Sequence, residues 1–172
     1  MSAPAAPTLY VVDGYNVLHA LFPSLRAAEL ADKRRWLVDQ LAGFAAVRGA
    51  RICLVFDAHG QRTITCEAVS GTAVEVCYAG GTFSADTLIA RRVAEQSPET
   101  GVVVVSADHE VQRTASRAGV RRMTPRELGL EIGALEKGLA NDENSSRIRT
   151  TLEDKVDIET WLSLERLRTE GS

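Results

Sequence analysis

Four aspartates in this chain lie at the end of a short apolar run or shortly after one, and this recurrence restricts how the chain can fold. The run 102–105 consists of four valines, a composition typical of a strand buried on both faces of a parallel sheet. Ligands of open parallel sheets bind at the edge formed by the carboxyl ends of the strands. We therefore expect the four carboxylates to meet at that edge: Asp13 after 9–12, Asp57 after 52–56, Asp86 within 82–86, and Asp108 after 102–105.

Carboxylates that are held together repel one another and resist ionisation. A divalent cation relieves this repulsion, and hard cations such as Mg²⁺ prefer oxygen ligands. The sequence therefore predicts a metal-dependent site that acts on phosphates. Its predicted metal ligands and catalytic residues are Asp13, Asp57, Asp86 and Asp108, and Asn16 is expected to orient a ligand or the substrate.

Strand patterns and helical patterns alternate along the chain, which predicts a layered α/β fold with right-handed connections. Strands are expected at 9–12, 51–56, 102–105 and 120–123, and helices at about 25–47, 84–96, 109–117 and 124–139. A loop or short turn is expected between the first strand and Pro23. The clearest helix start is a capping box with Thr124 and Glu127, which has Pro125 in its first turn.

The segment 60–81 allows two interpretations. Two alternating stretches, 63–69 and 73–78, are separated by Ser70, Gly71 and Thr72. This pattern is typical of a hairpin, and it equally fits a mobile loop followed by one strand of the sheet.

Residues 1–140 are expected to form one domain, because a chain of 172 residues is long enough for a single core. The polar segment 141–146 predicts a linker. A final helix at about 153–168 carries Trp161, whose large ring favours docking on the body or on a partner.

The composition argues against several classes of protein. Cys53 lies in a strand pattern and is expected in the core, whereas Cys66 and Cys77 complete an odd set without CxxC spacing. This set argues against a structural zinc site and against a disulfide framework. No apolar run is long enough to cross a bilayer and the start of the chain is a poor secretion signal, so we expect a cytoplasmic protein without a membrane partner.

Arginine dominates the basic residues, since only three of the 20 are lysines. The net charge of −3 argues against bulk attraction to nucleic acid, but a local positive rim is compatible with it. Arginine binds phosphate oxygens in pairs, so Arg91, Arg92 and Arg113 are candidates for holding a substrate backbone. His59 is a candidate for proton transfer or phosphate contact. The alternative interpretation of these arginines is that they belong to helix faces exposed to solvent and do not bind a substrate.

Other phosphate chemistries fit the sequence less well. The chain has no Walker lysine motif, and no GxGxxG opens a helix after the first strand. A phosphatase of the haloacid dehalogenase type would need an aspartate where Tyr15 stands. A phospho-receiver would need a lysine after a late strand, and 105–107 offers none.

These motifs together resemble the YacP-like NYN domain family, a branch of the PIN-like nuclease superfamily, over nearly the whole chain. Four of the similar segments carry site residues: DGYN at 13–16, VFDAH at 55–59, SAD at 84–86, and SAD at 106–108, which is followed by Gln112. The other two are the helix start at 124–128 and the closing LExLR-like tail at 152–168. The pairing of DGYN with VFDAH at this separation is the most specific part.

The resemblance implies a Rossmann-like (PIN-like) three-layer α/β fold, with a central, mainly parallel sheet flanked by helices and a C-terminal helical tail. It also implies an endoribonuclease that uses Mg²⁺ or Mn²⁺ to cleave single-stranded RNA. Members of this branch are associated with ribosomes and with cleavage of messenger RNA, so RNA and the ribosome are the implied partners.

The third motif departs from the family pattern. The family usually has acids where this chain has Thr87 and Ala90, so two carboxylates are missing from one side of the site. This departure favours one cation over two. It also motivates the alternative of a non-catalytic RNA- or ribosome-binding module. Hydrolysis of a small phosphoester is a third interpretation.

Overall fold

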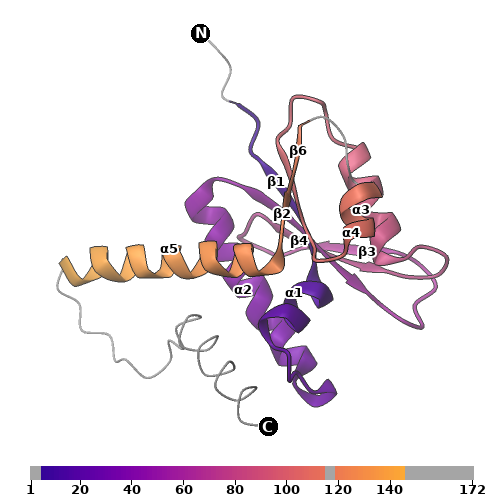
Figure 1. The fold of residues 1–172 in the computed structure, drawn as a ribbon, viewed down its shortest axis with the longest axis horizontal. Coiled ribbons are helices and arrows are strands. Elements are labelled where there is room, and N and C mark those ends of the chain that lie inside the picture. The colour runs from indigo at the N-terminus through magenta and orange to yellow at the C-terminus, as the bar shows by residue number, and fades with distance from the viewer. Residues whose placement is uncertain (1–4, 115–118, 146–172) are drawn as a thin grey trace.

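A computed structural model describes residues 5–114 and 119–145 of the protein. Within these residues, six strands form one sheet in the order β3-β4-β2-β1-β5-β6 (Figure 1). The elements in chain order are β1 (Leu9–Asp13), α1 (Gly14–Leu21), the short 3-10 helix η1 (Ala27–Glu29), α2 (Leu30–Arg48), β2 (Arg51–Asp57), β3 (Thr65–Ala68), β4 (Val74–Ala79), α3 (Ala85–Ala94), β5 (Val102–Val105), α4 (His109–Thr114), β6 (Val120–Met123) and α5 (Pro125–Ser145).

The sheet is mainly parallel, as expected from the sequence. β1 pairs in parallel with β2 and β5, β2 with β4, and β5 with β6, while β3 is antiparallel to β4. The chain leaves β1 toward β2 and later returns to β5 on the other side of β1. The carboxyl ends of β1 and β5 therefore lie where the winding direction reverses, which is where ligands bind in such sheets.

Helices cover both faces of the sheet, so the fold has three layers (Figure 1). One face packs with α1, α2 and α5 around a core that includes Leu54, Phe56 and Leu128. The other face packs with α3 and α4 around Val11, Val55 and Ile89. Alternate residues of each strand therefore serve opposite cores, as the pleat of a strand requires. The predicted three-layer α/β fold is confirmed.

The segment 60–81 forms a hairpin, which resolves the two interpretations of its pattern. β4 joins the sheet beside β2, and β3 lies outside it at the edge. Both alternating stretches are thus strands.

The structure corrects two expected boundaries. A loop was expected after the first strand, but the chain turns at once into α1, and the following long helix begins at Leu30. The segment expected to be a linker is helical through Ser145, as part of α5. The helix expected at about 153–168, with Trp161, lies outside the described residues. Among the described helices, none combines the length and apolar character that crossing a bilayer requires.

The cysteines also differ from expectation. Cys66 and Cys77 form a disulfide, which the odd cysteine count and the absence of CxxC spacing had argued against. The reason is the hairpin register, because the two residues are direct cross-strand partners in β3 and β4. Cys53 is a free thiol in the core, as predicted.

Candidate functional site

A cavity of about 760 Å³ opens at the carboxyl edge of the sheet. It brings together three of the four predicted aspartates with the predicted Asn16 and His59. The lining consists of Asp13, Tyr15, Asn16, His19, Leu30, Arg34, Asp57, Ala58, His59, Gln61, Tyr78, Ala85 and Asp86.

Asp13 is fixed by the junction between β1 and α1. It ends the strand and caps the helix, accepting a hydrogen bond from the backbone N–H of Asn16 at 3.2 Å. The next residue must be small, because a Cβ on Gly14 would overlap the Phe56 ring. The Asp-Gly pair thus lets the helix start directly beneath the cavity.

Asp13 is the electrostatic centre of the site. Burial raises the pKa of its carboxyl to about 6, against a lowering by the hydrogen bond from Asn16. The charges of Asp86, Asp108 and Asp57 raise the pKa further. The other three predicted aspartates therefore all act on Asp13, whose carboxyl favours either a proton or a nearby cation.

Asp86 shows the same electrostatic coupling from the start of α3. Burial raises its pKa, followed by the charges of Asp108, Asp57 and Glu110. Ser84 positions this helix by capping it, since Ser84 Oγ accepts a hydrogen bond from the Thr87 N–H at 3.2 Å. The Thr87 hydroxyl lies 3.0 Å from the same oxygen. The backbone and the side chain of Thr87 thus both contact the residue that caps α3.

Asp108 follows β5 and is tied to the first motif through Asn16. Asn16 Oδ1 accepts a hydrogen bond from the backbone N–H of Ala107 at 2.6 Å, across 91 positions of sequence. Asp108 itself accepts from the Glu110 N–H at 2.8 Å. Asn16 therefore joins the start of α1 to the loop after β5, in addition to lining the cavity.

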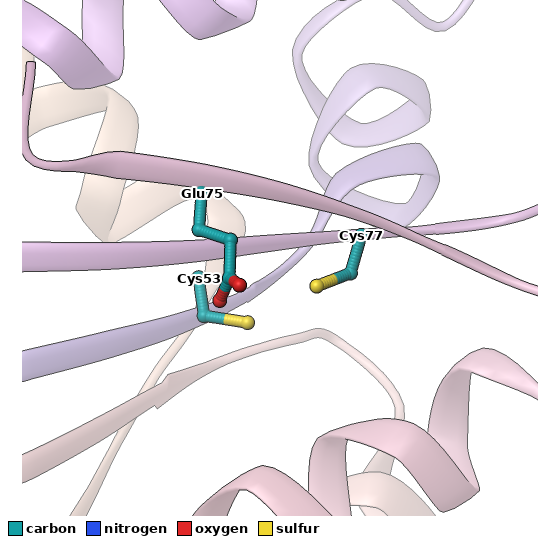
Figure 2. Close-up of side chains that lie close together, drawn as sticks. All are labelled: Cys53, Glu75 and Cys77. Carbon is teal, nitrogen blue, oxygen red and sulfur yellow. The ribbon is translucent and has the colours of Figure 1, made fainter. Parts of the chain in front are cut away.

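The donor set fits a hard divalent cation, because it offers carboxylate oxygens around a carboxyl whose ionised form is disfavoured without one. In the described part of the chain, three ligand atoms within 4.8 Å of one another occur only at Cys53, Glu75 and Cys77 (Figure 2). The aspartate oxygens are more widely spaced. Mg²⁺ tolerates this spacing, since it usually keeps several waters and uses one or two carboxylates.

The predicted basic residues divide between different surroundings. His59 lines the cavity, whereas Arg91 pairs with Glu95 at 3.0 Å. Arg92 points to the hairpin, where it pairs with Glu75 at 3.2 Å. Arg113 lies exposed on α4.

Three cavity residues were not expected from the sequence, namely Tyr15, Arg34 and Tyr78. Phe56 lies between the two tyrosines, with ring centroids 4.9 Å from Tyr15 and 5.8 Å from Tyr78. Arg34 Nη1 donates a hydrogen bond to Tyr15 Oη at 3.1 Å. The signals available were the position of Tyr15 inside the DGYN motif and the basic cluster at 33–35.

A second cavity of about 530 Å³ extends the first one over α2 and the hairpin. Arg34 and Tyr78 line both cavities, and Arg35 lines the second. We call the two together the trough. It leads from the carboxylates past aromatic rings and arginines.

Comparison with known proteins links this chain to one family. A family model described as "YacP-like NYN domain" matches residues 10–169. The curated protein YacP of Bacillus subtilis (strain 168) is 27% identical over 164 residues, which cover 94% of this chain and 93% of that protein. Crystal structures of Rae1 (YacP) from Bacillus subtilis, and of a point mutant of it, align with a TM-score of 0.67 and 26% identity, over 94% of this chain and 91% of theirs.

Proposed function

The chain belongs to the YacP-like NYN domain family, within the PIN-like nucleases, and on this premise we propose that it is a metal-dependent endoribonuclease that cleaves single-stranded RNA. The observation that carries the proposal is the electrostatic coupling of the half-buried Asp13 to three other aspartates at the edge of a cavity. Such coupling is costly for the fold, and a bound dication that serves catalysis accounts for it.

Asp13, Asp57, Asp86 and Asp108 would hold Mg²⁺ or Mn²⁺, one or two of them directly and the others through waters that the ion keeps. The ion would lower the pKa of a bound water and offset charge at the phosphate. The protein residues have separate tasks. Asn16 keeps the loop that carries Asp108 beside the end of β1 through its bond to Ala107. His59 and Arg34 lie in the cavity lining, where they can contact phosphate oxygens.

The trough supports a single-stranded substrate. Recognition of single-stranded RNA relies on bases stacked on aromatic rings and on arginine contacts to the backbone. The partly exposed Tyr15 and Tyr78 offer such rings beside the carboxylates, and Arg34 and Arg35 follow them. The family resemblance favours messenger RNA on the ribosome as the substrate, and Arg113 remains a proposed contact outside the trough.

A cleavage assay with a fluorescent single-stranded RNA and Mn²⁺ tests this proposal. Asp13→Asn keeps the size of the side chain and its capping oxygen but removes the charge. Loss of a residue that only contacts a metal ligand typically reduces activity by roughly 10–100-fold. We expect Asp13→Asn to reduce cleavage by more than this, because Asp13 is a proposed ligand itself. The matched control is Asp39→Asn, at an exposed aspartate on α2 that lines neither cavity.

Full cleavage by Asp13→Asn would contradict the proposal. The wild-type chain could also bind RNA and cleave neither RNA nor any nucleotide of a panel, with Mn²⁺ or with Mg²⁺. The non-catalytic binding module motivated by Thr87 and Ala90 would then replace the nuclease proposal. Cleavage of small phosphoesters in place of RNA would favour the third interpretation.

A further inference from the structure

Three sulfur atoms and a carboxylate gather on the sheet face that packs against α3. In the strand register, Cys53 of β2 lies opposite Glu75 of β4, and Cys66 of β3 lies opposite Cys77 of β4. Because side chains alternate along a strand, Glu75 and Cys77 point to the same face. Three adjacent strands therefore direct all four side chains to one face of the sheet.

The ligand atoms are close enough to share one ion. Cys53 Sγ, Cys77 Sγ and a carboxylate oxygen of Glu75 all lie within 4.8 Å of one another, as Figure 2 shows. Cys66 Sγ is bonded to Cys77 Sγ and so lies beside the same group. The sulfurs of Cys53 and Cys77 are buried, while Cys66 and the half-buried Glu75 connect them to solvent.

The group already holds one positive charge, the guanidinium of Arg92. One nitrogen of Arg92, on α3, lies 3.2 Å from Glu75, 3.1 Å from Cys66 Sγ and 3.3 Å from Cys77 Sγ. Burial raises the pKa of the Cys53 thiol to about 11, while the charge of Arg92 lowers it. A metal ion that binds here must displace thiol protons, and Arg92 offsets part of the negative charge that the thiolates bring.

We propose that Cys53, Cys66, Cys77 and Glu75 form a Zn²⁺ site that exists only while the Cys66–Cys77 disulfide is reduced. Thiolates select zinc over magnesium, and four protein ligands make a closed, tetrahedral and structural site. This site is separate from the carboxylate cavity and does not depend on the proposed nuclease activity.

The two states are linked by a balanced redox step. A dithiol reductant breaks the S–S bond, supplies two electrons and two protons to Cys66 and Cys77, and itself becomes a disulfide. Zinc binding then releases the protons of the three thiols to solvent. In the oxidised state Cys66 and Cys77 are bonded to each other, so the set of four ligands is incomplete.

Co²⁺ titration of the full chain tests the site, because thiolate–Co²⁺ bonds give charge-transfer absorption in the near ultraviolet. Chain reduced with dithiothreitol and desalted without oxygen should develop this band, and Zn²⁺ should abolish it. Oxidised chain should give none. In addition, Zn²⁺ should raise the Tm of the reduced chain and not that of the oxidised chain.

Two variants identify the ligands at positions that solvent reaches. Cys66→Ser and Glu75→Gln should each weaken the binding of Co²⁺ to reduced chain by about tenfold or more. The control is Glu67→Gln, at an exposed glutamate that directly follows Cys66 in β3 and whose own side chain points to the other face of the sheet. A circular dichroism melt confirms that each variant is folded.

A reduced wild-type chain without the band at excess Co²⁺ would overturn the proposal. So would a band of equal strength and affinity in Cys66→Ser and Glu75→Gln, because the ion would then bind elsewhere.

Discussion

Asp13 combines a structural role with a cost to stability. Its carboxylate caps α1, yet burial and three neighbouring aspartates disfavour the charge that it carries. Asparagine caps a helix as well as aspartate does, so the two roles can be separated by one substitution.

Asp13→Asn is therefore expected to stabilise the metal-free protein at pH 7 by about 3 kcal/mol, since burial raises the pKa from 3.8 to about 6 and one pKa unit corresponds to about 1.4 kcal/mol. The folded-state pKa of about 6 exceeds the unfolded value of 3.8, so wild-type stability falls as the pH rises between them. The advantage of the variant should be complete above pH 6 and absent below pH 3.8. Urea denaturation with a chelator at several pH values measures it, and a pH-independent difference would contradict this account.

Gly14 gives a second prediction at the same junction. The Cβ of Gly14→Ala would meet the Phe56 ring, so we expect a loss of about 1–3 kcal/mol in the free energy of unfolding. Gly43→Ala, on α2 with open space around it, should instead gain up to about 1 kcal/mol. Chemical denaturation compares the two, and equal effects would exclude the contact as the cause.

The sequence pattern identified the aspartates but not their aromatic neighbours. Asp13 and Asp57 end buried strands, and that position alone predicts the edge at which they lie. Tyr78 reaches the cavity because β4 pairs with β2 in a particular register, with Phe56 opposite Tyr78. Register depends on the whole sheet and not on local pattern, so this contact could not be predicted.

At the scale of elements, helix starts differed in how well the sequence predicted them. The capping box of α5 is present as expected, with the Thr124 N–H donating to Glu127 and the Glu127 N–H donating to Thr124 Oγ1. The start of α1 was missed because its cap is also the last residue of a strand and the helix has only eight residues.

Removing the α5 cap tests how much this start contributes. Thr124→Ala should lower the free energy of unfolding by about 1 kcal/mol, because the Glu127 N–H loses its acceptor. Thr82→Ala, at an exposed threonine before α3, serves as the control and should change it little. Urea denaturation of both variants measures the effect, and a loss confined to Thr82→Ala would contradict it.

The hairpin shows why the cysteines were misjudged. The number and the spacing of cysteines indicate disulfide frameworks and metal motifs whose residues are close in sequence. The pairing of Cys66 with Cys77, and the approach of Cys77 to Cys53, arise only when β3, β4 and β2 are assembled.

At the scale of the molecule, the two edges of the parallel sheet differ in character. The carboxyl edge holds the aspartates and the trough, whereas Arg51 begins β2 at the opposite edge. Alternation of strands and helices was enough to predict the layers. The order of the strands could not be predicted, because the sequence does not show which strand the hairpin of β3 and β4 pairs with.

This polarity predicts how salt affects RNA binding. Arg34→Gln should weaken binding of single-stranded RNA. It should also reduce, by about one, the slope of the logarithm of the association constant against the logarithm of the salt concentration. Arg51→Gln removes the same charge from the other edge and should leave the slope nearly unchanged. Fluorescence anisotropy at several salt concentrations measures both, and an equal effect of the two variants would count against the trough as the binding surface.

The hydrogen bond from the Ala107 amide to Asn16 spans 91 positions, so it cannot form until most of the chain has left the ribosome that makes it. A nascent chain that ends before this point carries Asp13 and Asp57 without Asp108 or the bond that holds its loop. Fragments released early from translation would therefore have an incomplete acidic centre. Under the nuclease activity proposed above, completion of synthesis would itself be the safeguard against cleavage by such fragments.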